Sequence, residues 1–366
     1  MFDDEKIIEN SYNYPCPGCG GRLAYSAEKQ KVNCEYCGYT EEVDSANDML
    51  VEHPLEEFME NAPREIVETL SKKVFDCQSC GSKFAVESDK IKVRCGFCGS
   101  DSVNLEAYDH QYIKPAGIVP FKVAQAKAES QFKKWIKRGW FHPNKLKRMA
   151  IIEDLHGIYI PFWTYDAQTY SQWHGQAGFH YYETERTYVN GKWESRQVQR
   201  TRWESRSGSL DHFFDDVLIS GSHGLNQQSI QRVYPYRLEE VVNYDPKLML
   251  GWESEIYDVE VDEGYEMADR VMDQRLRGMC SSQLGGDTQR GLKVDTEKRY
   301  KTFKHIVLPL WISSYRYRNK VYHFTVNGQT GKVAGKKPIS PFKVAFVVAM
   351  VILVILAVVL IAEFGR

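Results

Sequence analysis

Eight of the nine cysteines form two copies of one pattern, in which two Cys-x-x-Cys pairs are separated by fourteen residues. Four thiolates are the donor set that tetrahedral Zn²⁺ prefers in structural sites, and a short hairpin can bring two such pairs together. Because cysteine would fill every coordination position, no position stays open for water or substrate. We therefore predict two structural Zn²⁺ ions, one bound by Cys16, Cys19, Cys34 and Cys37 and the other by Cys77, Cys80, Cys95 and Cys98.

Each Cys-x-x-Cys pair is followed by a glycine, which can adopt the positive φ that lets backbone N–H groups approach sulfur. These glycines are Gly20, Gly38, Gly81 and Gly99. The copies begin 61 residues apart and share further residues, so they are an internal repeat: Ala24, Lys29, Lys31 and Val32 recur as Ala85, Lys90, Lys92 and Val93.

Two other interpretations of the cysteines are possible. Disulfides would require an oxidising compartment, and redox catalysis fits an isolated Cys-x-x-Cys better than paired ones. Zinc ribbons often bind nucleic acid, but residues 1–110 hold 22 acidic and 11 basic side chains, and residues 35–60 contain no Lys or Arg. Phosphate would be repelled. We therefore favour protein docking over nucleic-acid binding.

The C-terminal part of the sequence predicts a membrane anchor. Val344 to Ala362 are 19 consecutive apolar residues, enough at about 1.5 Å each to cross a hydrocarbon layer of roughly 30 Å. A buried core helix is the alternative. Basic residues precede the run (Lys332, Lys336, Lys337 and Lys343) and only Arg366 follows it. This asymmetry predicts a single-pass protein of the bacterial cytoplasmic membrane with a cytosolic N-terminus.

The 366 residues, of which 43% are hydrophobic and 13% aromatic, suffice for several packed domains. We predict an α+β chain with a mainly antiparallel, β-rich middle region. The expected parts are zinc ribbon 1 (1–45), an acidic linker (46–72), zinc ribbon 2 (73–110), the middle domain (111–335), a stalk at Pro338 and Pro341 (336–343) and the transmembrane helix (344–362).

Within the middle region, Asn190-Gly191 between Tyr181–Val189 and Trp193–Trp203 predicts a β-hairpin. Leu310–Tyr317 and Val321–Val326 predict a second. Helices are expected from Val123 to Lys137 and after a capping Asp262, through Met267, Val271 and Leu276. Cys280 should be a small core residue.

Ile158–Trp163 and Ile306–Trp311 resemble each other, and each contains a proline. Proline lacks an N–H, so both segments are expected to begin edge strands. The echo indicates either pseudo-symmetric halves of one domain or two independent core strands.

Residues 122–148 are rich in Lys and Arg, with one acid and interleaved aromatics. Such a segment can lie on an anionic leaflet or stack on single-stranded nucleic acid, or it can be an ordinary amphipathic helix with a solvated basic face. The residues expected to contact a membrane or other anionic surface are Lys133, Lys134, Trp135, Lys137, Arg138 and Trp140.

No nucleotide-binding loop or zinc-protease motif is present, and Ser220–Gly224 departs from G-x-S-x-G at its first position. Asp215 and Asp216 are adjacent, so on a regular strand they would face opposite sides. We expect His212 and His223 to be structural. No residue set predicts catalysis.

Four segments carry a family resemblance: Tyr159–Asp166, Thr201–Trp203, Phe213–Leu218 and Val326–Gly331. The chain resembles bacterial zinc-ribbon membrane proteins that are often labelled as relatives of the primosomal replication-restart helicase. The helicase label rests on the cysteine pairs and is not carried over as an activity. The resemblance implies association with SPFH (flotillin-like) and PspA-type membrane-organising proteins, with the ribbons as docking modules.

The sequence thus favours a non-enzymatic, tail-anchored adaptor that contacts the lipid bilayer through residues 344–362 and recruits a protein partner. The alternatives are a membrane-tethered, nucleic-acid-binding accessory of replication and an uncharacterised enzyme. Four thiolates in a non-redox setting favour zinc over iron.

Overall fold

The computed structural model describes residues 14–43, 50–61, 67–78, 83–86, 103–146, 151–152, 155–189, 191–223, 232–317 and 320–364. Within these ranges the chain is an α+β fold whose strands are mainly antiparallel, as the sequence predicts. A small sheet near the N-terminus contains β1 (Leu23–Ser26), β2 (Lys31–Cys34) and β3 (Thr40–Glu41). All other described strands join one large sheet.

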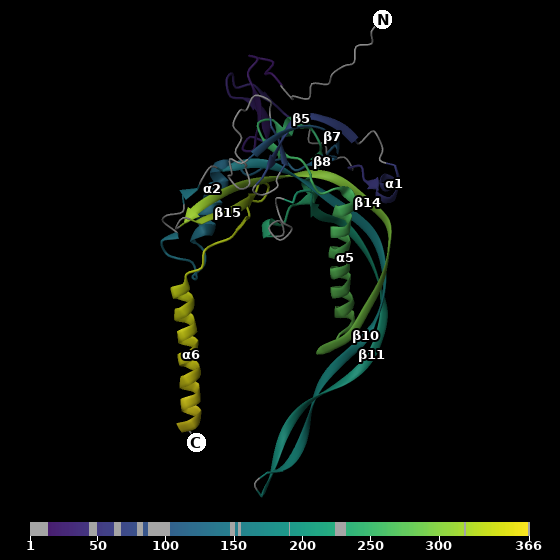
Figure 1. Ribbon diagram of the computed structural model, residues 1–366, viewed down its shortest axis with the longest axis vertical. Helices are drawn as coiled ribbons and strands as arrows, with labels where there is room; N and C mark the ends of the chain where they lie inside the picture. Colours follow the sequence, from purple (N-terminus) through teal and green to yellow (C-terminus); the bar gives the residue numbers. More distant parts are fainter. Residues whose placement is uncertain are drawn as a thin grey trace.

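Three very long strands form the centre of the large sheet: β10 (His156–Val189), β11 (Lys192–Ser220) and β14 (Thr288–Tyr317). β10 lies between β11 and β14 and is antiparallel to both. Figure 1 shows these strands curving together, with the β10–β11 hairpin extending beyond the end of β14.

Shorter elements complete the large sheet and its covering. The strands are β4 (His53–Pro54), β5 (Val67–Cys77), β6 (Lys83–Val86), β7 (Val103–Ile113), β8 (Gly117–Ile118), β9 (Ile151–Ile152), β12 (Val242–Asn243), β13 (Glu253–Glu255), β15 (Lys320–Asn327) and β16 (Val333–Gly335). The helical elements are α1 (Leu55–Glu60), α2 (Gln125–Lys137), α5 (Val261–Leu284), α6 (Pro341–Phe364) and two short 3₁₀ turns, η1 (Leu238–Glu240) and η2 (Pro246–Met249).

Both predicted hairpins are confirmed. β10 and β11 are joined by two residues, and Gly191 has the positive φ of +80° that a tight hairpin turn needs. β14 and β15 pair from Leu310–Asn327 to Tyr317–Lys320. The first hairpin is much longer than expected, because β10 already begins at His156 and β11 continues to Ser220.

The expectation that Pro161 and Pro309 lie on edge strands is wrong, since β10 and β14 are central. Each proline instead lies where its strand changes neighbour on one side. Pro161 falls between the pairing of β10 with β13 and its pairing with β11, and Pro309 falls between the pairing of β14 with β8 and with β15. The missing N–H therefore costs no ladder hydrogen bond.

The two similar segments pair with each other. Ile160 lies directly opposite Leu308, and the flanking residues of Ile158–Trp163 and Ile306–Trp311 match in antiparallel register around that pair. The similarity between the two segments therefore corresponds to one antiparallel strand pair with local two-fold symmetry at the centre of the sheet.

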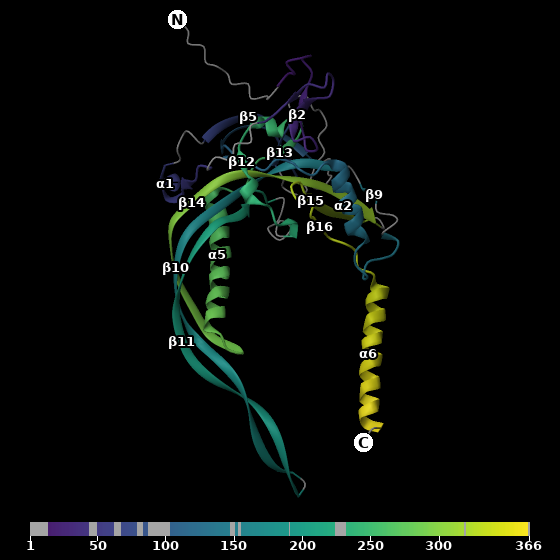
Figure 2. The same cartoon turned by 180° about the vertical axis from the view of Figure 1, so that it is seen from behind.

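α5 covers the side of the curved sheet that faces α6, as Figures 1 and 2 show. Its fully buried residues recur every three or four positions, the period of one helix face; they are Val261, Gly264, Ala268, Met272, Leu276, Cys280 and Leu284. A Cβ on Gly264 would lie 2.3 Å from the hydroxyl oxygen of Tyr165. This glycine lets helix and sheet approach closely.

Two details of the predicted helices change. The N-cap of α5 is Glu260, and Asp262 lies in the first turn, where its carboxylate accepts a hydrogen bond from the Glu263 N–H at 2.8 Å. The cap predicted at Asp262 is therefore wrong by two positions. α2 ends at Lys137 as expected but begins at Gln125, two residues after the predicted start at Val123. Cys280 is buried as predicted.

We expect Leu276→Ala to lower the free energy of unfolding by about 3 kcal/mol, because it leaves a cavity between α5 and the sheet. Leu276 is fully buried, whereas neighbouring Arg277 is exposed. Arg277→Ala is the matched control and should change stability little. Chemical unfolding of the full chain in detergent, followed by circular dichroism, measures both. Equal stability of the two variants would contradict the packing described for α5.

Candidate metal centre, carboxylate network and surface near α6

The four cysteines of the first repeat converge. Cys16 and Cys19 precede β1, Cys34 ends β2 and Cys37 lies in the next turn. The Sγ atoms of Cys16 and Cys37 are 3.5 Å apart, those of Cys19 and Cys34 are 3.6 Å apart, and all four ligand atoms lie within 4.8 Å of one another. A disulfide would need about 2.05 Å. Four sulfurs each about 2.3 Å from one tetrahedral ion would lie about 3.8 Å apart, so this cluster could hold a metal ion.

Backbone N–H groups point at these sulfurs, as the glycine pattern predicts. Gly20 and Gly38 have φ values of +71° and +75°. The Gly18 N–H donates to the Cys16 Sγ at 3.4 Å. The N–H of Cys37 lowers the pKa of the Cys34 thiol to about 7. Thiolates are the form that binds metal, so the backbone favours ligation.

The first cysteine repeat, residues 14–43 as described, packs against the segment around Leu250 and Trp252. The Tyr25 N–H donates to the Leu250 carbonyl at 2.9 Å, and the Trp252 indole N–H donates to the Tyr25 carbonyl at 3.1 Å. Trp252 in turn stacks on Phe121, with ring centroids 3.9 Å apart. A metal ion that holds the four cysteines in place would therefore also stabilise the contact between this cysteine repeat and the core around Trp252 and Phe121.

Of the second cysteine set, only Cys77 lies in the described residues. It ends β5 and is fully buried. Cys80, Cys95 and Cys98 lie outside the described residues, as do Gly81 and Gly99. The second zinc site stays a prediction.

Asp215 and Asp216 do not face opposite sides as expected. Asp166, Asp215 and Asp216 each have one carboxylate oxygen within 4.8 Å of such an oxygen on the other two. The cause is a bulge: the β10–β11 register shifts between Tyr165 and Ala167, and Asp216 has a positive φ of +52°. The Asp216 N–H then donates to the Asp166 carboxylate at 2.6 Å.

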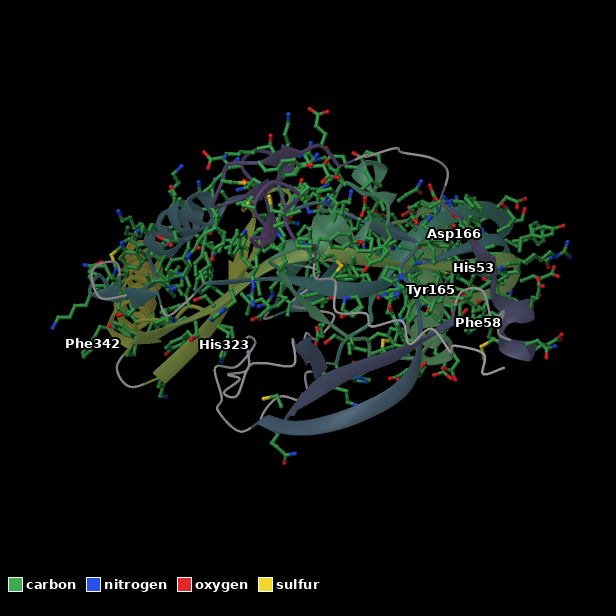
Figure 3. All side chains as sticks on the ribbon, turned by 90° about the horizontal axis from the view of Figure 1, so that it is seen from above. His53, Phe58, Tyr165, Asp166, His323 and Phe342 are labelled. Atoms are coloured by element: carbon green, nitrogen blue, oxygen red, sulfur yellow. The ribbon has the colours of Figure 1, made fainter. Side chains whose placement is uncertain are left out.

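Lys304 supplies a positive charge beside Asp216 and Glu52. It is 8% exposed, and its ammonium lies 2.8 Å from Asp216 and 2.9 Å from Glu52. Burial, with a smaller effect of Glu52, raises the pKa of the Asp166 carboxyl to about 7. Figure 3 shows Asp166 near His53 at the end of the molecule that also holds Phe58 and Tyr165. The network fastens residues 52–58 to the long strands.

His223 has partners that the sequence did not identify. Its ring nitrogens lie 3.1 Å from the carboxylate of Asp258 and 3.2 Å from that of Glu263. Burial lowers the pKa of His223, but the two acids outweigh it and raise the pKa above its usual value. The two acids therefore favour the protonated form of the His223 ring and hold the ring in place.

α6 contains a stretch, Pro341–Val358, that is long and apolar enough to cross a membrane. None of this stretch is buried against the rest of the protein, unlike a core helix. The helix starts three residues before the predicted span, with Pro341 in its first turn, where proline's missing N–H costs nothing.

The segment before α6 is fastened to the loop that follows α2. The ammonium of Lys337 lies 4.1 Å from the ring centre of Trp135 and donates to the Arg138 carbonyl at 3.0 Å. Lys343 donates to the carbonyls of Trp140 and His142 at 2.8 and 2.9 Å. The residues predicted as a stalk are therefore held against the body.

These contacts bring part of the predicted basic surface to the root of α6. Trp140 is 54% exposed, and the side chains of Lys134, Lys137 and Arg138 are exposed. Lys133, also exposed, lies 3.8 Å from Glu129 on the same helix. Their contact with a membrane stays a prediction.

A similar protein exists in Bacillus subtilis (strain 168), where it is named uncharacterized protein YdjG. It is 27% identical over 337 residues, which cover 91% of this chain and 92% of that protein. No family model and no solved structure matches the chain. The similarity extends over nearly the full length of both proteins and assigns no activity.

We expect Cys19→Ser to remove one metal ion per chain, because three thiolates and a hydroxyl hold zinc much less tightly than four thiolates. Elemental analysis of the purified full chain gives the metal content. Cys280→Ala, which changes a buried cysteine outside the cluster, should leave the metal content unchanged. An unaltered metal content in Cys19→Ser would exclude this cluster as a metal centre.

Asp166→Asn should stabilise the protein more at pH 8 than at pH 5. The folded-state pKa of Asp166 is raised to about 7 from 3.8, so its contribution to stability is greatest at low pH and is lost as pH rises through 7. At pH 5 the wild-type carboxyl is already neutral, and Asn keeps the acceptor for the Asp216 N–H. Thermal unfolding of both proteins at each pH gives the comparison, and an identical difference at the two pH values would contradict the shift.

Proposed function

We propose that this protein is a non-enzymatic adaptor of the bacterial cytoplasmic membrane, anchored by α6, whose cytosolic part docks a membrane-organising protein. The observation that carries the proposal is the placement of two features. The cysteine cluster lies on one side of the body, and α6 leaves from the other side (Figures 1 and 2). Such an arrangement suits a protein that is held at one end and recruits a partner at the other.

Charge supports a cytosolic orientation. Lys332, Lys336, Lys337 and Lys343 precede the apolar run, and Arg366 is the one basic residue after it. Cytoplasmic flanks of a membrane span carry the excess of Lys and Arg. A reducing cytosol also keeps the cysteines available as thiolates.

The donor set supports a structural role for the metal, which we propose to be Zn²⁺ in both repeats. Four cysteines leave no coordination position for substrate. When bound, each ion would supply folding energy to a small module that has little core of its own. The ribbons would then serve as rigid docking surfaces, as the resemblance to zinc-ribbon membrane proteins implies.

The outer part of the β10–β11 hairpin offers a second docking surface. Beyond Gly178 the strand β10 pairs with β11 alone. Tyr182 and Tyr188 lie opposite Gln199 and Trp193, so these four side chains share one face. Arg186, opposite Ser195, lies on the same face. Exposed Tyr, Trp and Arg are typical of protein interfaces.

The other face of the hairpin is charged. The Arg200 guanidinium lies 2.7 Å from the Glu183 carboxylate and also pairs with Glu185. Figure 1 shows the hairpin extending from the body on the same side as α6. Charged strands with open edges are unsuited to lipid, and an isolated two-stranded hairpin is marginally stable in water. A protein partner that covers the face with Tyr182, Tyr188 and Trp193 would stabilise the hairpin in water, and the resemblance implies an SPFH or PspA-type protein.

Affinity capture of the tagged full chain, extracted from membranes in mild detergent, tests the adaptor. Wild type should retain an SPFH or PspA-type protein. The double variant Tyr182→Ala with Trp193→Ala should retain about tenfold less, since aromatic residues dominate binding at interfaces. Glu183→Gln, on the opposite face, is the matched control. A further variant with Cys77 and Cys80 changed to Ser tests docking by the second repeat.

Retention of nucleic acid with replication proteins instead would contradict the adaptor and support a membrane-tethered accessory of replication. Recovery of wild type from the soluble fraction would contradict the anchor itself.

A further inference from the structure

A hollow of about 370 Å³ lies at the root of α6. Its wall contains Tyr317 at the end of β14, Lys320 and Tyr322 of β15, and Pro143 from the loop after α2. The segment that enters α6 closes it, with Pro338, Ile339, Ser340, Pro341 and Phe342. Sequence patterns did not indicate this hollow, because its walls come from segments far apart in the chain.

The depth of the hollow relative to a bilayer follows from the position at which the apolar run of α6 begins. The uninterrupted apolar run begins at Val344, directly after the residues that close the hollow. Ile339 and Phe342 are 63% and 83% exposed, which places apolar side chains at its mouth. Figure 3 shows Phe342 at the opposite end of the molecule from Asp166. If α6 spans the membrane, the hollow lies in the lipid headgroup layer.

The charge of the lining favours an anion. Lys320 is exposed and is the one charged residue that lines the hollow; no Asp or Glu lies among the lining residues. The described residues include no acid within ion-pair distance of its ammonium. Tyr322, which is partly exposed, adds a hydroxyl group that can donate to a phosphate oxygen.

The neighbouring lysines are already engaged. The ammonium of Lys343 has three hydrogen-bond acceptors, Trp140 O, His142 O and Asn144 Oδ1, which match the three donors of an ammonium. Lys337 donates to the carbonyls of Trp135 and Arg138 at the C-terminal end of α2. These cations shape the hollow, and Lys320 remains to bind a ligand.

The wall behind Tyr322 is rigid. Tyr322 stacks on Tyr315 with ring centroids 5.4 Å apart, and the Tyr315 hydroxyl donates to the Lys336 carbonyl at 2.8 Å. A headgroup that enters would therefore meet ordered side chains, so little entropy is lost on binding.

We propose that this hollow binds one anionic phospholipid, with its phosphate on Lys320 and its acyl chains along Phe342 and the surface of α6. Aromatic side chains beside a cation at the membrane surface suit such a molecule, because the headgroup is charged and its glycerol region is amphipathic. The inference rests on the proposed membrane anchoring by α6.

Native mass spectrometry of the full chain, released from nanodiscs of phosphatidylglycerol and phosphatidylcholine, counts retained lipids. Wild type should retain one phosphatidylglycerol in preference to phosphatidylcholine. Lys320→Gln should reduce this retention about tenfold, the size expected for a lost charge-assisted hydrogen bond, and Lys320→Arg should preserve it. Lys293→Gln removes an exposed charge of β14 and should retain lipid like wild type.

Equal retention of the two lipids by wild type, or undiminished phosphatidylglycerol in a membrane-inserted Lys320→Gln variant, would overturn the lipid site while leaving the anchor intact. Failure of wild type to enter nanodiscs would overturn both the anchor and the site.

Discussion

Strands β10 and β14 lie side by side from the His156–Ile312 pair to the Gly178–Thr288 pair. Nearly every other described feature depends on this pairing. It brings together residues more than a hundred positions apart, which costs loop-closure entropy before any side-chain contact repays it. This entropy cost is offset by the burial of apolar side chains on both faces of these strands, among them Tyr159, Trp163, Tyr165 and Leu308. α5 then packs on the face that the paired strands create.

The two prolines in this pairing illustrate how a central strand can tolerate a residue that cannot donate. Each is placed where one neighbouring strand ends and the next begins. The carbonyl of Pro161 still accepts from Gly221, and that of Pro309 accepts from Gly328. β10 therefore pairs with β13 before Pro161 and with β11 after it, and β14 pairs with β8 before Pro309 and with β15 after it. Neither proline carbonyl is left without a hydrogen bond.

Two of the segments singled out in the sequence, Phe213–Leu218 and Val326–Gly331, also shape the backbone. Asn327 accepts from the N–H groups of Gln329 and Thr330 through its side-chain oxygen, at 2.9 and 2.8 Å, which closes the turn after β15. Asp216 forms part of the bulge that brings its carboxylate close to those of Asp166 and Asp215 and beside Lys304. Polar residues in these segments therefore have local roles in a turn and a bulge.

Short-range order was readable from the sequence, and long-range placement was not. The spacing of Cys16, Cys19, Cys34 and Cys37, the Asn190-Gly191 turn, the periodicity of α5 and the apolar run of α6 each involve neighbouring residues whose physical preferences fix local geometry. The contact of Glu52 with Lys304 joins residues 252 positions apart, and the attachment of Lys337 and Lys343 to the α2 loop spans about 200. Such contacts follow from which strands pair and where a bulge shifts their register. Periodicity within a segment carries no information about the partner that its outer surface will meet, so only the tertiary structure decided them.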